Sequence, residues 1–230
     1  MGRGEINFRM KQKPTVIVAC EYSGTVRSAF EERGWNAISV DLLPTEVAGD
    51  HIQEDIFKVL NNLRDYHIRK VDLLIAHPTC TFLANSGAKH LYLGMKKENG
   101  RNEARWAAMR QGADFFYKLW TYPNATHVAV ENPIMLGCAK EIIGANPSQV
   151  VQPWMFGHTE IKATCLWLRN LPKLVPTNNV REETMSMSYA DRARVHWMAP
   201  GPDRWKERSR TLAGLACAMA TQWGDYIESL

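Results

Sequence analysis

The sequence predicts an α/β protein built on a Rossmann-like, doubly wound and mostly parallel sheet. Short runs of branched apolar residues, typical of buried strands, alternate with helical periodicity between residues 15 and 130. The 230 residues are 45% hydrophobic, which is enough to build a sizeable core. Because right-handed crossovers join strand–helix–strand units, we expect the strands to pair in parallel.

The expected elements follow one another in a regular order. Strands are predicted where branched apolar residues cluster, at residues 15–20, 36–41, 71–76 and 127–130. Helices are predicted between them, where apolar residues recur every three or four positions, at residues 25–33, 55–64 and 101–122. Gly34 ends the first helix and Pro123 ends the third.

After Asn132 the pattern becomes less regular. Residues 134–143 favour a helix, and residues 149–154 and 161–168 favour strands. Residues 175–208 are predicted to form a loop-rich basic insertion. Residues 209–230 are predicted to form a final helix capped by Ser209. Without a repeat or a flexible linker, residues 1–230 are expected to form a single domain.

Composition excludes several classes of protein. No apolar run approaches the roughly 20 residues that span a bilayer, and the amino terminus lacks a signal-peptide core, so we expect a cytoplasmic protein without a membrane partner. Five cysteines form no CxxC pair, which indicates neither a disulfide framework nor a metal site. The formal net charge of +4 is compatible with a polyanionic partner. The oligomeric state is not predicted.

Residues 71–87 carry the strongest functional signal. The apolar run is followed by Pro78, which cannot donate to a sheet ladder, and Cys80 comes next in a small polar loop. Open α/β sheets bind their ligands beyond the carboxyl ends of the strands. Cys80 is therefore a candidate nucleophile, and a small buried hydrophobe is the simpler alternative.

A cofactor site is predicted beside the first two strands. Asp41 ends the second strand, 20 residues after Glu21, and Asp55 begins the next helix. These carboxylates, without a phosphate-binding glycine loop, suit a cofactor with ribose hydroxyls and positive charge, such as S-adenosylmethionine. A turn residue for Asp41 and a helix cap for Asp55 are the alternatives. The loop that would hold the cofactor consists of Ala19, Cys20, Glu21, Tyr22, Ser23 and Gly24.

The order of these motifs resembles that of the cytosine-5 DNA methyltransferase family, and more closely that of small phage-encoded DNA methyltransferase-like proteins. The resemblance spans residues 16–133 and rests on the loop 19–24, Asp41, Glu54-Asp55-Ile56, Thr79-Cys80-Thr81-Phe82 and Glu131-Asn132-Pro133. It implies a methyltransferase fold, S-adenosylmethionine as cofactor and cytosine as substrate. Thr79 stands where the family has proline, and no large target-recognition domain fits in this chain.

Roles for individual residues follow from the resemblance. Cys80 would add to carbon 6 of cytosine, Glu131 would supply a proton or hydrogen bond to ring nitrogen 3, and Asn132 would hold the loop. Lys162 is similar to a basic residue of a later family element. Further cofactor contacts would come from Leu42, Ile56, His77 and Pro78, and substrate contacts from Thr81, Asn85 and Ser86.

The basic segment 192–210 suggests a nucleic-acid partner. Its arginines are interleaved with Trp197 and Trp205, a combination that suits phosphate contacts and base stacking, and a solvated loop is the alternative. Arg208 and Arg210 are the candidate phosphate ligands. DNA, duplex or single-stranded, is the expected substrate. The alternatives are a free pyrimidine nucleotide modified by the same chemistry and a non-catalytic protein that binds nucleic acid or a host factor.

Overall fold

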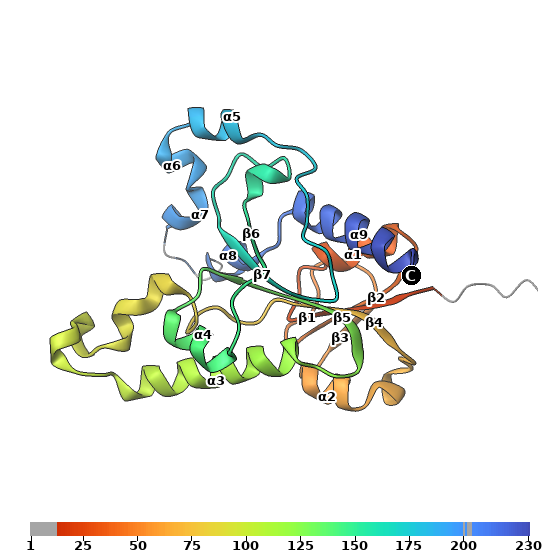
Figure 1. The fold of residues 1–230 in the computed structure, drawn as a ribbon, viewed down its shortest axis with the longest axis horizontal. Coiled ribbons are helices and arrows are strands. Elements are labelled where there is room, and N and C mark those ends of the chain that lie inside the picture. The colour runs from red at the N-terminus through yellow and green to blue at the C-terminus, as the bar shows by residue number, and fades with distance from the viewer. Residues whose placement is uncertain (1–12, 200, 202–203) are drawn as a thin grey trace, which may run out of the picture.

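The computed structural model describes residues 13–199, 201 and 204–230 and is organised around one seven-stranded sheet (Figure 1). The strand order is β3-β2-β1-β4-β5-β7-β6, in which β1 to β5 pair in parallel and β7 pairs antiparallel with β5 and β6. The strands are β1 (Thr15–Ala19), β2 (Asn36–Asp41), β3 (His51–Gln53), β4 (Val71–Ala76), β5 (Ala125–Pro133), β6 (Gln149–Val151) and β7 (Thr164–Arg169). The prediction of a mostly parallel, Rossmann-like α/β sheet is confirmed.

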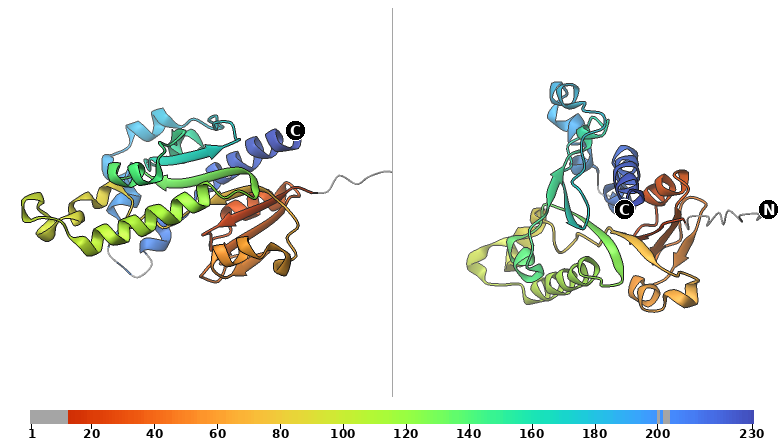
Figure 2. Two further views of the ribbon diagram at one scale, coloured as in Figure 1. Left: turned by 60° about the horizontal axis from the view of Figure 1, so that its bottom comes forward. Right: turned by 45° about the vertical axis from the view of Figure 1, so that its right-hand side comes forward.

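Helices cover both faces of the sheet (Figure 2). On one face lie α1 (Thr25–Glu32) and α9 (Ala213–Glu228), which pack against each other. On the other face lie α2 (Ile56–Asn61), α3 (Glu103–Trp120) and α4 (Gly137–Ile143). The sequence of strand β4 is continuously apolar because both faces of the strand are buried. Leu73 and Ile75 pack into one hydrophobic cluster and Leu74 packs into the other.

Two strands differ from the prediction. Strand β3 was missed because it has only three residues and no apolar run. Strand β5 is longer than residues 127–130, because its end pairs antiparallel with β7 through Glu131↔Leu166 and Asn132↔Cys165. Glu131 and Asn132 therefore lie within the strand and are held by its ladder. The expected strands near residues 149–154 and 161–168 correspond to the shorter β6 and to β7.

The carboxyl-terminal region contains more helix than expected. The segment 175–208 includes α5 (Arg181–Ser186), α6 (Tyr189–Arg192), α7 (Arg194–Trp197) and most of α8 (Arg204–Ser209). The prediction that Ser209 caps the last helix is wrong, since α9 begins at Ala213 and its N-cap is Leu212. The Ser209 hydroxyl instead donates to the Lys206 carbonyl, at 2.8 Å, within α8.

Short 3-10 turns connect several of these elements. They are η1 (Leu63–Tyr66), η2 (Asn85–Leu91), η3 (Leu93–Met95), η4 (Lys97–Asn99) and η5 (Pro153–Met155). The segment from η2 to η4 extends beyond the carboxyl edge of β4 to the amino end of α3 (Figure 1). Within the described residues, no helix combines the length and the apolar character needed to cross a membrane.

Candidate active site

Four residues from four strands form a row at the carboxyl edge of the sheet. Ala19 pairs with Val40 and Ala76, and Ala76 pairs with Val130. One step further in the same register lies the row itself, which consists of Asp41, Cys20, His77 and Glu131. The ladder continues through this step, because the Cys20 amide donates to the Val40 carbonyl at 2.7 Å and the His77 amide donates to the Ala19 carbonyl at 3.0 Å. The parallel register thus gathers residues that are far apart in sequence.

His77 and Glu131 are in contact within this row. Nδ1 of His77 lies 3.3 Å from Oε2 of Glu131, and the two side chains are 8% and 16% exposed. Nε2 of His77 is buried and has no hydrogen-bond partner among the described residues. The sequence had placed His77 beside the cofactor, and that role stays a prediction.

The loop that carries Cys80 is held by bonds to β5. The amide of Asn132, a residue only 1% exposed, donates to the Pro78 carbonyl at 3.0 Å, which is the kind of backbone bond expected of this residue. After the cysteine, the chain turns tightly, because the Cys80 carbonyl accepts from the amides of Leu83 and Ala84 at 3.0 and 2.9 Å. The position of the thiol is therefore set by two neighbouring strand ends.

Charged groups from three parts of the chain act on the Cys80 thiol. Burial and the nearby Glu131 carboxylate raise the pKa of Cys80 above its usual value, and the positive charges of Arg208 and Lys162 oppose this rise. The thiol consequently keeps its proton at neutral pH. The sequence predicts these same groups as parts of one site, and their common role at Cys80 stays a prediction.

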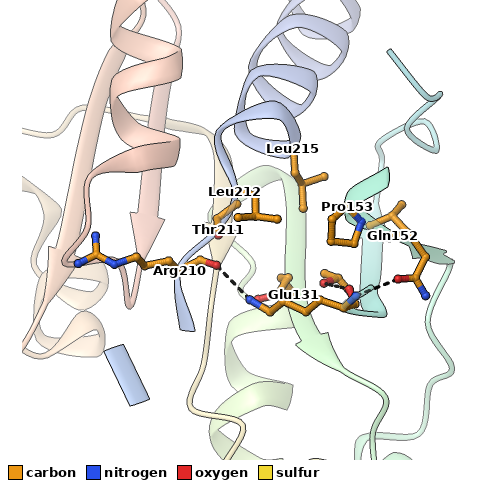
Figure 3. Close-up of a pocket in the computed structure, with 10 residues that line it drawn as sticks. Glu131, Gln152, Pro153, Arg210, Thr211, Leu212 and Leu215 are labelled. Atoms are coloured by element: carbon orange, nitrogen blue, oxygen red, sulfur yellow. Dashed lines mark hydrogen bonds between the residues drawn. The ribbon is translucent and has the colours of Figure 1, made fainter. Parts of the chain in front are cut away.

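A small pocket lies between β5, β7 and the start of α9 (Figure 3). Nζ of Lys162 donates to the Arg210 carbonyl at 3.0 Å, and the Lys162 amide donates to Oε1 of Gln152 at 3.0 Å. The cavity volume is about 20 Å³, which is less than one nucleobase needs. Further lining residues include Glu131, Pro153, Thr164, Leu212 and Leu215.

The loop between β1 and α1 is shaped by the Glu21 side chain. Its carboxylate oxygens accept from the amides of Val26 at 2.6 Å and Arg27 at 3.2 Å, at the start of α1. Burial raises the pKa of Glu21, while the charge of His77 and these amide bonds act in the opposite direction. Both carboxylate oxygens are thus bound to amides of α1, and the expected contact of Glu21 with a cofactor stays a prediction.

Segment 204–212 covers the same loop. The Tyr22 hydroxyl donates to the Lys206 carbonyl at 2.9 Å and lies 3.3 Å from the Ser209 hydroxyl. The Tyr22 ring also packs near Trp205, with ring centroids 6.0 Å apart. Ser23 is buried next to it, with its hydroxyl 3.2 Å from that of Thr25. No local sequence pattern indicates that segment 204–212 packs on this loop.

The acidic candidates also have structural roles. Oδ1 of Asp41 accepts from the Leu43 amide at 2.9 Å, and Oδ1 of Asp55 accepts from the Phe57 and Lys58 amides at 2.9 and 3.1 Å. Asp41 thus forms a turn and Asp55 caps α2. Burial raises the pKa of Cys20 to about 12, and the charges of Asp41 and Asp55 add to the rise. The two acids therefore lie near the same strand end.

The apolar candidates next to these acids differ in exposure. Leu42 is 69% exposed directly after β2, so its side chain is accessible to a ligand. Ile56 is 4% exposed and packs in the hydrophobic core. Because the core covers the Ile56 side chain, its backbone is the part available to a ligand, and its predicted role in cofactor binding stays a prediction.

The residues predicted to contact the substrate lie in several different elements of the structure. The Thr81 carbonyl accepts from Nη2 of Arg105 at 2.6 Å, and the guanidinium of Arg105 stacks on Phe82. Asn85 and Ser86 are exposed in η2. Arg210 forms ion pairs with Glu46 and Glu207, at 2.5 and 3.1 Å, so its guanidinium is already engaged by carboxylates.

Sequence reasoning missed several residues of this region. Arg105 and Glu46 were not singled out, since isolated charged residues on a helix and in a loop give no local signal. Gln152, Thr164 and Leu215 line the pocket only because β5 and β7 pair antiparallel and α9 packs nearby. No short-range pattern in the sequence indicates those contacts.

Comparisons with known proteins leave the family open. No protein-family model matches the chain, and no curated protein matches its sequence. A solved structure to which it is similar is the Entamoeba histolytica methyltransferase EhMeth, with 15% identity and a TM-score of 0.43. The match covers 74% of this chain and 58% of that one, so the chain spans less than two thirds of that methyltransferase. At this level the likeness carries no functional argument.

Proposed function

We propose that the protein is an S-adenosylmethionine-dependent methyltransferase that acts on carbon 5 of cytosine in DNA. The observation that carries this proposal is the environment of Cys80. Its thiol follows a strand end and lies within the electrostatic influence of Glu131, Lys162 and Arg208. A nucleophile on which the charges of a carboxyl group and two cations act suits covalent addition to a base.

Three side chains near the end of β2 support S-adenosylmethionine as the proposed cofactor. Asp41 at the end of β2 suits the ribose hydroxyls, and the exposed Leu42 side chain offers an apolar surface to a purine. Asp55 adds a second carboxylate nearby. When bound, the cofactor supplies a methyl group activated on a positively charged sulfur.

The first step of the proposed chemistry transfers one proton and forms one bond to this chain. Glu131 takes the proton of the Cys80 thiol and gives it to ring nitrogen 3, while the sulfur bonds to carbon 6 of the base. The electron pair of the carbon 5–carbon 6 double bond then becomes available at carbon 5. After methylation, a solvent water takes the proton on carbon 5 and the Cys80 sulfur leaves as a thiolate. Ring nitrogen 3 then returns its proton through Glu131 to that sulfur, which restores the aromatic ring and the thiol.

The pocket that Glu131 lines is too small for a base, so we expect it to widen when substrate binds. The pocket of about 20 Å³ is lined on one side by Arg210, Thr211 and Leu212, which lie between α8 and α9. A duplex substrate also requires flipping of the base, at a cost of a few kcal/mol. We therefore expect segment 209–212 to shift on substrate binding, with Arg208 close to the phosphates.

Transfer of label from radiolabelled S-adenosylmethionine tests the function. Duplex DNA, single-stranded DNA and dCMP are offered to the wild-type protein and to Cys80→Ala, with Cys138→Ala as a control outside the row. We expect label on DNA with wild type and the control, and none with Cys80→Ala. Label on dCMP alone would identify a nucleotide-modifying enzyme. No label on any substrate would refute the methyltransferase proposal and favour a binding protein.

Covalent trapping tests the position of the modified atom. DNA containing 5-fluoro-deoxycytidine should form a stable adduct at Cys80 in the presence of the cofactor, because fluorine blocks the final elimination. Mass spectrometry of the peptide that contains Cys80 reads the result. Methyl transfer without any adduct would show that the thiol has no covalent role.

A further inference from the structure

His77 occupies the centre of the row at the carboxyl edge of the sheet. It follows β4, the strand between β1 and β5, and its amide continues the ladder to Ala19. Its neighbours in register are Cys20 on one side and Glu131 on the other. The imidazole thus lies between the loop proposed to hold the cofactor and the proposed catalytic carboxyl group.

One carboxylate contacts the His77 ring, and a second is within its electrostatic influence. Nδ1 lies 3.3 Å from Oε2 of Glu131, and Glu21 is close enough for the charge of His77 to act on its pKa. The Glu21 oxygens are engaged by the amides at the start of α1. Glu131 has no comparable anchor, because the contact with His77 is the only side-chain hydrogen bond to its carboxylate found among the described residues.

The contact determines how Glu131 presents its carboxylate. Oε2 lies against His77, and Glu131 is also one of the residues that line the pocket. A carboxylate held at one oxygen loses its rotational freedom, and its other oxygen then has a fixed direction. Burial of both partners keeps water from competing for this bond.

We propose that His77 is a positioning residue for Glu131. In its Nδ1–H tautomer, it donates to Oε2 of Glu131 and thereby directs Oε1 toward ring nitrogen 3 of the substrate base. This inference rests on the proposed function. A role in orienting the proton-transfer group is an alternative to the sequence-based assignment of His77 to the cofactor.

The variants His77→Asn and His77→Gln test the two ring nitrogens of His77 one at a time. The amide nitrogen of asparagine reaches the place of Nδ1, and that of glutamine reaches the place of Nε2. We expect His77→Asn to keep kcat within about 10-fold of wild type and His77→Gln to lower it about 100-fold, because misplacing a catalytic group by about 1 Å costs that much. The Kd for S-adenosylmethionine should be unchanged in both variants.

A matched control removes a buried histidine elsewhere in the sheet. His127 is 5% exposed and its Nδ1 lies 3.0 Å from the Asp72 carbonyl, away from the row. His127→Asn reports the effect of such a change on folding alone. If His77→Asn and His77→Gln lose activity equally, or if both bind the cofactor more weakly with kcat unchanged, the positioning role is refuted.

A spectroscopic measurement separates this inference from the proposed function. Nitrogen-15 NMR of the wild-type protein at about pH 8 should show a proton on His77 Nδ1 and none on Nε2, and Glu131→Gln should shift the Nδ1 signal. A bare Nδ1 would overturn the positioning role even if DNA is methylated. The expected tautomer in a protein that methylates nothing would refute the proposed function and leave the contact structural.

Discussion

Replacing Gly24 by alanine tests whether the loop after β1 needs glycine for its close packing. Gly24 has φ +70, and a Cβ added there would lie 2.4 Å from Cγ2 of Val47 and 2.7 Å from Nη2 of Arg27. Arg27 cannot move away freely, because it is fully buried and its Nη2 donates to the Val47 and Ala48 carbonyls at 3.0 and 2.9 Å. The added methyl group must therefore displace the loop between β2 and β3.

Gly34 provides a matched control at the other end of α1. It has φ +80 and nothing within 4 Å of an added Cβ. The left-handed conformation costs alanine about 1–2 kcal/mol at either position, and overpacking adds about 1–3 kcal/mol at Gly24 alone. We therefore expect Gly24→Ala to lower the free energy of unfolding by about 1–3 kcal/mol more than Gly34→Ala does.

Urea unfolding followed by circular dichroism measures both variants. In a chain of this size each kcal/mol shifts Tm by roughly 2–4 °C, so thermal melts give a second reading. Calorimetric titration should also show weaker binding of S-adenosylmethionine to Gly24→Ala than to Gly34→Ala. Equal losses of stability in the two variants would refute the close-packing argument.

Three further predictions concern the carboxyl edge and α2. Glu131→Gln removes a charge that raises the pKa of Cys80, so the fraction of thiolate at pH 8 should increase. Iodoacetamide should then label Cys80 severalfold faster than in the wild type, and an unchanged labelling rate would contradict the electrostatic assignment. Asn132→Ala leaves the Pro78 carbonyl without its donor and should cost about 1–3 kcal/mol in urea unfolding, and parental stability would contradict this. Asp55→Ala should cost about 1 kcal/mol through loss of the α2 cap, whereas Asp55→Asn should keep most of it; equal losses would show that the cap acceptor is unimportant.

Local patterns predicted most of the sheet and its helices. The apolar run of β4 and the helical periodicity around α1 and α3 are visible in short windows, and the structure has these elements near the expected residues. Strand β3 and the start of α9 were misjudged, because they depend on pairing with β2 and on packing against α1. Ser209 looked like a cap, but its hydroxyl is used within α8.

The sequence by itself determined the alternation of strands and helices and the residue that follows each strand, because side-chain chemistry and periodicity are local properties. Only the tertiary structure decided which of those residues meet. The parallel register sets His77 beside Glu131, and the tertiary structure places Lys162 and Arg208 where their charges act on the pKa of Cys80. Such contacts depend on pairing and packing between segments far apart in the chain, which no local pattern records.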